Sequence, residues 1–296
     1  MNKALLFNIL FQFVFFNYAV SQDDLMNLLD YDKDSNKELV AATFKTTHIV
    51  NGQSIEAPAK GELIFNISHR FGKINQGAYE LFGLDQSTIR FGFDYSLNDR
   101  LSLGVGRSSF QKTYDGSLKF KILRQSASNS SPLSLVLFSS VALNTLKWQD
   151  NERKNYFSSR LAYTHQLLIA RKFSSNFSLQ LMPSLVHKNL VPLNEDNNDL
   201  YSTGIGGRYK LTKRLTVNAE YYYFPAGQIK GDFYSPISFG FDIDTGGHVF
   251  QLIVSNSQAM FERAMLTETS GRWSKGDIFI GFNLTRVFTI KKSKTA

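Results

Sequence analysis

Apolar and polar residues alternate with a period of two along most of the chain, and residues 88–109 show the pattern most clearly. The string TIRFGFDYSL at residues 88–97 places aromatic and aliphatic side chains at every second position and charged or small ones between them. Successive side chains of a strand point to opposite faces, so this string predicts a strand with one oily and one wet face. After Asn98, Asp99 and Arg100 the pattern resumes in LSLGVG, which predicts an antiparallel hairpin.

The same alternation predicts about twelve strands in all. Residues 41–50 also look extended before the turn signal Asn51-Gly52, which leaves open a thirteenth barrel strand or a segment inside the barrel. A tight turn is expected at residues 114–116, and residues 74–85 have the character of a short loop helix. The predicted strands are residues 61–71, 88–97, 101–109, 117–124, 133–144, 156–171, 177–188, 201–211, 215–224, 235–243, 247–255 and 277–288.

The connections between these strands alternate in length. Short turns at residues 97–101, 171–176, 211–215 and 243–247 alternate with longer links at 147–155, 191–200, 225–234 and 256–276. Outer-membrane barrels have tight turns on the periplasmic side and longer loops outside. The rhythm therefore predicts an all-β protein: a single transmembrane antiparallel up-and-down β-barrel of about twelve strands with short loop helices.

The first residues predict export. Lys3 precedes an apolar run to Phe16, and the small-residue pattern before Gln22 is typical of a signal-peptidase site. We expect residues 1–21 to be a cleaved signal peptide, residues 22–40 to be an acidic N-terminal leader, and residues 41–296 to form the barrel. This predicts the outer membrane of a Gram-negative bacterium.

Composition and charge narrow the class further. The chain has no cysteine, which excludes disulfides and zinc-thiolate sites. Its 26 Phe and 13 Tyr favour strands, and a mean hydropathy of −0.20 excludes a helical membrane bundle. The net charge is +8, but Lys and Arg are dispersed, so we expect no nucleic-acid partner.

The alternative architecture is a secreted β-sandwich or soluble barrel. The polar side of the strands is rich in glycine and ionised groups, whereas the other side carries Phe, Tyr, Leu and Ile. A water-filled or network-filled lumen suits the first set and lipid suits the second, so the pattern favours the membrane barrel. The glycines on the polar side are Gly92, Gly104, Gly106, Gly204, Gly206, Gly240 and Gly281.

Candidate chemistry is sparse. Alternation places His165 and His248 with the lipid-side residues, and His69 is expected to be a rim histidine. No nucleophile motif or metal-binding spacing occurs, and residues 195–199 are interpreted as a solvated loop. We therefore predict no catalytic residue, no metal, no cofactor and no enzyme activity. The candidates that alternation places in the lumen are Arg90, Asp94, Lys119, Lys121, Arg160, Arg208, Lys210, Glu220 and Asp242.

Two functions remain open at this stage. The charged lumen favours a small-solute channel or transport pore. The alternative is a closed structural or partner-binding barrel, because side chains alone could fill a lumen of this width. An outer-membrane hydrolase is a third and less favoured possibility. The expected partners are outer-membrane lipid and either small solutes or a periplasmic protein. The acidic leader, at residues 23–38, is expected to interact with the basic lumen or its periplasmic mouth. Residues 277–288 are expected to close the barrel against residues 61–71.

Several strings resemble those of a family of outer-membrane β-barrel proteins from Bacteroidota that is classed only as a domain of unknown function. They are ATFKTTHIVNGQSIE within residues 41–56, KGELIFNISHRFG at 60–72, IRFGFDYSLNDRLSLGVGRS at 89–108, DGSLKFKILRQ at 115–125 and GDIFIGFNLTRVF at 276–288. The resemblance covers most of the mature chain and implies an outer-membrane barrel. It brings no catalytic residue, ligand or cofactor with it.

Overall fold

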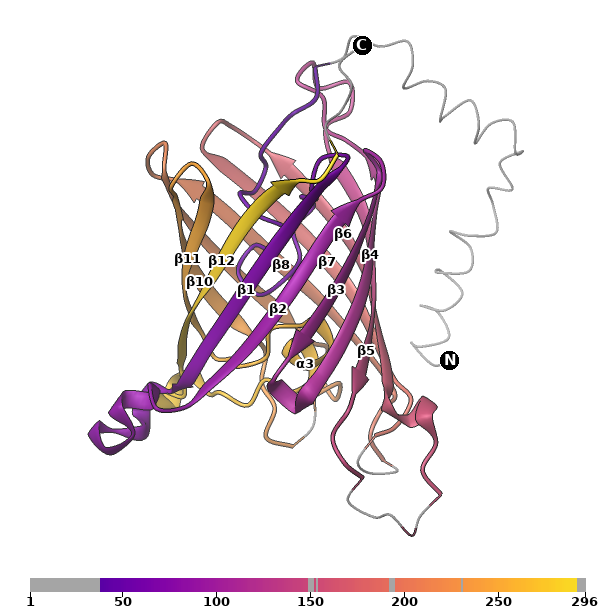
Figure 1. Ribbon diagram of the computed structural model, residues 1–296, viewed down its shortest axis with the longest axis vertical. Coiled ribbons are helices and arrows are strands. Elements are labelled where there is room, and N and C mark those ends of the chain that lie inside the picture. The colour runs from indigo at the N-terminus through magenta and orange to yellow at the C-terminus, as the bar shows by residue number, and fades with distance from the viewer. Residues whose placement is uncertain (1–37, 149–151, 153, 192–194, 230, 292–296) are drawn as a thin grey trace. The chain divides into compact units, whose positions relative to one another are not determined.

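Twelve antiparallel strands in the described part of the chain close into a barrel (Figure 1). The structure is a computed structural model that describes residues 38–148, 152, 154–191, 195–229 and 231–291, so the expected signal peptide and nearly all of the acidic leader lie outside it. The strands are β1 (Glu62–Lys73), β2 (Ser87–Ser96), β3 (Leu101–Ser108), β4 (Thr113–Leu123), β5 (Ser134–Asn144), β6 (Leu161–Lys172), β7 (Phe177–Lys188), β8 (Asp199–Lys210), β9 (Leu215–Tyr223), β10 (Ile237–Asp244), β11 (His248–Ser255) and β12 (Phe279–Thr289).

Each strand pairs with its neighbours in sequence, and β12 closes the ring on β1. The register runs from Glu62 opposite Thr289 to Lys73 opposite Phe279, with one irregularity near Arg70. Closure satisfies the backbone N–H and C=O groups that an open edge would leave unpaired in lipid. The predicted up-and-down barrel and its predicted closing pair are both confirmed.

The two faces of the wall follow the alternation in the sequence. Phe91 and Phe93 point outward and are about two-fifths exposed, whereas Arg90, just before Phe91, is buried in the lumen. Outward Phe65 stacks on Phe93 of the neighbouring strand, with ring centroids 4.8 Å apart. Such cross-strand aromatic pairs stabilise the sheet and give the outer surface its apolar character.

The two ends of the barrel differ in their connections. We name the end where β1 starts and β12 finishes the short-turn rim, which is uppermost in Figure 1. It carries the connections at residues 97–100, 124–133, 173–176, 211–214 and 245–247. The opposite end, the long-loop rim, carries residues 74–86, 109–112, 145–160, 189–198, 224–236 and 256–278. The predicted alternation of short and long connections is therefore confirmed, with two exceptions. Residues 124–133 form a long connection at the short-turn rim, and residues 109–112 form a short one at the long-loop rim.

One predicted turn is wrong. Residues 114–116 lie inside β4, because Asp115 points into the lumen and holds Arg90 with bonds of 3.0 and 2.5 Å. The chain turns earlier, at the 3₁₀ turn η3 (Phe110–Lys112), where Gln111 and Lys112 have positive φ. An Asp-Gly pair favours turns locally, but the buried ion pair keeps it in the strand.

Helices occur in the connections at the long-loop rim. They are η1 (Ile74–Gln76), η2 (Ala78–Gly83), η3, η4 (Phe157–Arg160), η5 (Trp273–Lys275) and α3 (Glu262–Thr267). Residues 74–85 contain η1 and η2, which confirms the expected loop helix. Among the described residues, no helix is long and apolar enough to cross a membrane.

Residues 41–58 form a hairpin inside the barrel, which we call the luminal hairpin. It enters at the short-turn rim, where Val40 donates to the Gln125 carbonyl at 2.9 Å, and returns there, where Ser96 donates to the Pro58 carbonyl at 2.7 Å. Residues 41–50 are thus a luminal segment and not a thirteenth strand. In Figure 1 this indigo chain runs down into the barrel and back behind β1 and β2.

The hydrophobic core lies within the lumen. Apolar side chains of the luminal hairpin pack with inward residues of the wall and with α3, which belongs to a connection of the long-loop rim. The lumen is therefore filled from both ends by the protein itself. Members of this cluster include Phe44, Ile49, Val50 and Ile55 from the hairpin, Phe138, Leu168, Met182 and Tyr222 from the wall, and Ala264, Met265 and Leu266 from α3.

Candidate functional site

The tip of the luminal hairpin is bound by one carboxylate of the wall. Glu220 on β9 accepts the backbone N–H of Val50 at 3.2 Å, of Asn51 at 2.8 Å, and of Gly52 at 3.0 and 3.1 Å. The Asn51-Gly52 pair makes a tight turn, closed by the Ile49 N–H on the Gly52 carbonyl at 2.8 Å. This turn directs consecutive N–H groups toward one point, which forms an anion-binding nest that Glu220 occupies.

The Asn51 side chain fixes the tip near the long-loop rim. Arg70 donates to its carbonyl oxygen at 2.6 Å, and its amide nitrogen donates to Ser238 at 3.0 Å and to Ser255 at 3.1 Å. Ser238 lies near the start of β10 and Ser255 ends β11, both at the long-loop rim. The hairpin therefore reaches through most of the length of the barrel.

Lysine and arginine side chains of the wall bind the carbonyl groups of the hairpin. Lys119 donates to the carbonyls of Thr47, Ser54 and Glu56 at 2.8 to 2.9 Å. Arg208 donates to two more carbonyls near the hairpin entrance, at 2.8 and 3.1 Å. These cations therefore satisfy buried backbone acceptors and do not line an aqueous path.

Neutral amides of the wall complete the hydrogen bonding of the hairpin. Gln180 bridges its return arm, donating to the Gln53 carbonyl at 2.7 Å and accepting from the Ile55 N–H at 2.9 Å. Gln251 donates to the Ile49 carbonyl at 2.8 Å, and Asn283 donates to the Val50 carbonyl at 3.2 Å. The backbone of the hairpin thus finds partners on many strands without joining the sheet.

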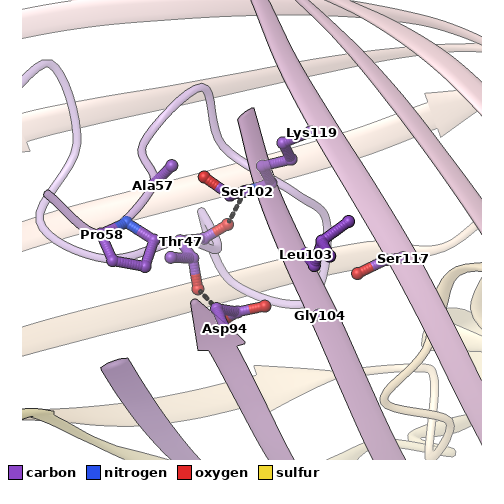
Figure 2. Close-up of a pocket in the computed structure, with 9 residues that line it drawn as sticks. All are labelled: Thr47, Ala57, Pro58, Asp94, Ser102, Leu103, Gly104, Ser117 and Lys119. Carbon is purple, nitrogen blue, oxygen red and sulfur yellow. Dashed lines mark hydrogen bonds between the residues drawn. The ribbon is translucent and has the colours of Figure 1, made fainter. Parts of the chain in front are cut away.

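A small cavity lies beside the hairpin, between β2, β3 and β4. Figure 2 shows the Thr47 hydroxyl, which donates to Asp94 at 3.2 Å, and Lys119 on the far side. Ser102 and Ser117 contribute further hydroxyls to its lining. The cavity volume is about 10 Å³, which is room for about one water molecule and not for a solute.

A second contact joins the hairpin to α3. Gln53 donates through Nε2 to Glu262 of α3 and approaches Nε2 of His48 at 3.0 Å. His48 Nδ1 lies 3.1 Å from the Thr47 hydroxyl, which itself donates to Asp94. A neutral His48 with its proton on Nδ1 satisfies every one of these bonds. Burial, with the charge of Lys119 next, holds the pKa of His48 well below its usual range.

Eight of the nine candidate lumen residues lie on strands and point inward. Arg90 and Asp115 form an ion pair, Asp242 accepts from Thr216 and Gln251, and Lys121 and Lys210 are half-buried toward the short-turn rim. The ninth, Arg160, ends η4 and stacks on Trp148 in the connection before β6. Since β6 starts only at Leu161, the alternation predicted for residues 156–171 did not extend to Arg160.

Sequence reasoning missed the amides and Arg70. Alternation alone places Arg70, Gln180, Gln251 and Asn283 on the inward side, but the predicted lumen residues included no amides and left out Arg70. Glu262 could not be identified as a lumen residue from the sequence, because nothing in residues 256–276 predicts that this connection folds into the barrel. An amide side chain can donate and accept hydrogen bonds, as a peptide backbone requires of its partners. Inward amides on the strands therefore indicate that a backbone segment binds inside the barrel.

The inward glycines make room for the filling of the lumen. A Cβ on Gly206 would lie 2.5 Å from Cδ1 of Ile49, and a Cβ on Gly240 would lie 3.3 Å from Cγ2 of Val50. Gly92 and Gly106 leave space for the guanidinium of Arg90 in the same way. The glycine-rich side therefore serves close packing inside the barrel, and not an open water channel.

The outer face holds one Ser–His pair. Ser139 and His165 are cross-strand neighbours, with Oγ and Nδ1 2.9 Å apart, on the lipid side of β5 and β6. Within the described residues, no carboxylate or amide orients the imidazole, and no group of three His, Asp or Glu side chains is placed to hold a metal ion. A hydrolase needs a nucleophile, a base and an orienting group together.

Comparison with known proteins gives a family and several barrels of low similarity. A family model described as "Membrane bound beta barrel domain (DUF5777)" matches residues 44–288. No curated protein matches the sequence. The KdgM porin is 10% identical, with a TM-score of 0.44 over 77% of this chain and 99% of that chain. Omp33 of Acinetobacter baumannii is 8% identical, with a TM-score of 0.42 over 79% and 100%.

Outer membrane phospholipase A from Escherichia coli has similar values. It is 10% identical, with a TM-score of 0.41 over 76% of this chain and 89% of that chain. The KdgM porin and the phospholipase therefore have similar identities and TM-scores.

Proposed function

The chain belongs to the family of membrane-bound β-barrel domains, and we propose that it is an outer-membrane transport barrel for small solutes, kept closed at rest by its luminal hairpin. The observation that carries the proposal is the binding of the hairpin tip by Glu220, which accepts three consecutive backbone N–H groups. Charge-assisted hydrogen bonds in a low-dielectric lumen are strong, so a hairpin held in this way blocks the passage.

The strand pairing of the barrel wall does not involve the hairpin. All twelve strands pair around the ring, and outside the named strands the hairpin and the residues next to it add only isolated bridges. Withdrawal of the hairpin would therefore leave no unpaired strand edge in lipid. This favours the interpretation of the hairpin as a removable plug rather than as a permanent part of the barrel structure.

Part of the wall around the hairpin is polar, although apolar inward residues such as Phe138, Leu168 and Met182 also pack in the lumen. The inward groups that bind or flank the hairpin include charged and amide side chains, which water can solvate once the hairpin leaves. Cations outnumber anions among them, which favours an anion-preferring path. The cations are Arg70, Arg90, Lys119, Lys121, Arg208 and Lys210, and the anions are Asp94, Asp115, Glu220 and Asp242.

The direction of entry suggests how the gate works. By the habit of outer-membrane barrels, the short-turn rim faces the periplasm and the long-loop rim faces outward. The hairpin enters from the periplasmic rim. Gln53 on its return arm donates a hydrogen bond to Glu262 of α3, which belongs to an external connection. We propose that displacement of α3 from outside loosens this contact and lets the hairpin withdraw toward the periplasm. Export through a cleaved signal peptide at residues 1–21 belongs to the same proposal.

A closed partner-binding barrel is the second candidate, and one observation favours it. All six residues of α3 are buried, so the lumen is filled from outside as well as from the periplasmic side. We do not propose a hydrolase, because the Ser139–His165 pair lacks the orienting group described above.

Planar-bilayer conductance separates the two candidates. The mature chain is compared with a truncation that starts at Ala59, after heat-modifiable gel mobility has shown that both are folded. We expect the mature chain to be nearly silent and the truncation to conduct with anion preference in a salt gradient. A folded truncation that stays silent would favour the closed partner-binding barrel, and equal measurable currents from both forms would exclude the hairpin as the gate.

A further inference from the structure

The connection between β1 and β2 exposes four large apolar side chains. Tyr79 is 93% exposed, Phe82 57%, Leu81 52% and Leu84 47%, all within or next to η2. We call these four residues the apolar spur. Clustered exposed aromatic and aliphatic side chains indicate a contact surface, because isolated loops rarely expose so many together.

The backbone of the spur is held in an unusual conformation. Leu81 has φ 46° and ψ 45°, and Phe82 has φ 54° and ψ 38°, which are left-handed values that side chains with a Cβ rarely adopt. Gly83 beside them has φ 85° and packs so closely on Gly72 that a Cβ would lie 2.6 Å from its carbonyl carbon. Strain of this kind persists where the surroundings enforce it and is common at functional sites.

The base of the spur is fixed to the last connection of the barrel. Asn75 donates to the Lys275 carbonyl at 3.0 Å and to Asp277 at 2.7 Å, and Lys73 forms a salt bridge with Asp277 at 3.5 Å. The Ile74 N–H donates to the Ile278 carbonyl at 2.9 Å. The spur thus projects from a base that is hydrogen-bonded to the connection before β12.

The spur continues the apolar outer wall of the barrel. In Figure 1 it is the purple coil at lower left, which projects sideways from the end of β1. The outward row on β1 runs to His69 and Phe71 at this end, and the His69 ring stacks on Phe282 with centroids 5.1 Å apart. Twelve tilted residues of β1 span about 30 Å along the barrel axis, so the spur starts where the apolar band of about 25 Å ends.

We propose that the apolar spur is an anchor that inserts into the lipid interface of the outer leaflet beside the barrel. Lipid is the occupant because the spur is continuous with the lipid-facing wall and points sideways from it. Aromatic and aliphatic side chains at such an interface gain by burial while the polar base stays hydrated. Lys73 lies at the base of this connection, where it pairs with Asp277, and Glu80 and Asp85 lie within the connection.

The absence of cysteine in the chain allows a direct test with single spin labels. Phe82→Cys and Tyr79→Cys are labelled with a nitroxide in the full mature chain and folded into dioleoylphosphatidylcholine vesicles. Asn197→Cys, an exposed position in another connection of the same rim, is the control. We expect the spur labels to collide more often with oxygen than with a water-soluble nickel chelate, and the control label to show the reverse. A spur label that prefers nickel, or that shows spin–spin broadening from a second copy, would overturn the anchor.

A double substitution tests the same proposal without a label. Leu81→Asn with Phe82→Asn removes the apolar surface, while Asn tolerates the left-handed backbone. We expect folding into the vesicles to slow by about threefold or more, with an unchanged rate in detergent micelles. Equal rates in vesicles for the double variant and the wild type would refute lipid insertion.

Discussion

Glu220 and Asn51, far apart in the sequence, meet inside the barrel, where the Glu220 carboxylate accepts the Asn51 N–H at 2.8 Å. Val50 and Gly52 donate to the same carboxylate, so one side chain of β9 binds the whole turn of the luminal hairpin. The acceptor has to be a carboxylate: an amide of the same size would present an NH₂ group to donors.

Substitution of Glu220 by Gln is therefore expected to loosen the tip. A hydrogen bond to a charged group contributes about 1.5 to 3 kcal/mol, so the population of the undocked hairpin should rise about tenfold or more. Single-channel recording measures this as a higher open probability. Asp199→Asn is the matched control, because Asp199 is exposed at the start of β8 and its side chain bonds with His187 on the outside of the barrel. Similar open probabilities in both variants would contradict the role of Glu220.

A substitution at Gly52 tests the docking of the hairpin tip by steric conflict. A Cβ at Gly52 would lie 2.1 Å from the Tyr222 hydroxyl oxygen, so Gly52→Ala should push the tip away and raise the conductance. In the double variant with Tyr222→Phe the nearest atoms become Oε2 of Glu220 at 3.1 Å and the ring carbon Cζ at 3.2 Å, and part of the block should return. A double variant as open as Gly52→Ala alone would show that another contact holds the tip.

The wall of this barrel could be predicted from the sequence, whereas its filling could not. Strand alternation depends only on each residue and its neighbours, so Phe91 and Arg90 reveal their faces directly. The hairpin depends on pairs such as Glu220 with Asn51, which no local pattern connects. Lys119 and Arg208 were expected to attract an acidic leader, but they bind backbone carbonyls of the hairpin. The interaction of that leader with the barrel remains a prediction.

The Arg90–Asp115 pair is expected to stabilise the wall. Both side chains are buried, and removing one partner leaves an uncompensated charge that costs about 3 to 5 kcal/mol. Asp115→Asn or Arg90→Met alone should therefore lower the urea midpoint of the vesicle-folded barrel clearly. Arg90→Met combined with Asp115→Leu should recover much of the loss. Additive losses in the double variant would contradict a direct pair.

Closure of the barrel should be sensitive to the last strand. The β12 strand pairs with both β1 and β11, so deletion from Gly276 onward leaves two strand edges without partners. Each unpaired backbone group in lipid costs several kcal/mol, and assembly should fail. Loss of the heat-modifiable band on a gel measures this failure. A truncation that keeps the band would show that β1 and β11 can pair directly.

The last prediction concerns pH and His48. The docked imidazole has a lowered pKa because it is buried, with Lys119, Arg90 and Arg70 adding in that order, whereas an undocked histidine takes a proton near pH 6.5. Docking is thus fully stable above about pH 6.5 and weakens as the pH falls below it. Glu262 acts in the opposite direction. Burial raises its pKa, so its contribution is complete at low pH and is lost as the pH rises through the raised value.

Conductance at several pH values separates these two groups. Between about pH 7.5 and 5.5 the wild type should open as the pH falls if His48 dominates. His48→Gln keeps a polar side chain but cannot take the proton. The open probability of this variant should therefore stay constant or decrease as the pH falls over the same range, because only Glu262 then responds to pH. Asp94 also faces this network through Thr47, and Asp94→Asn is the control that retains His48. Acid opening that survives in His48→Gln but disappears in Asp94→Asn would assign the response to the carboxylate.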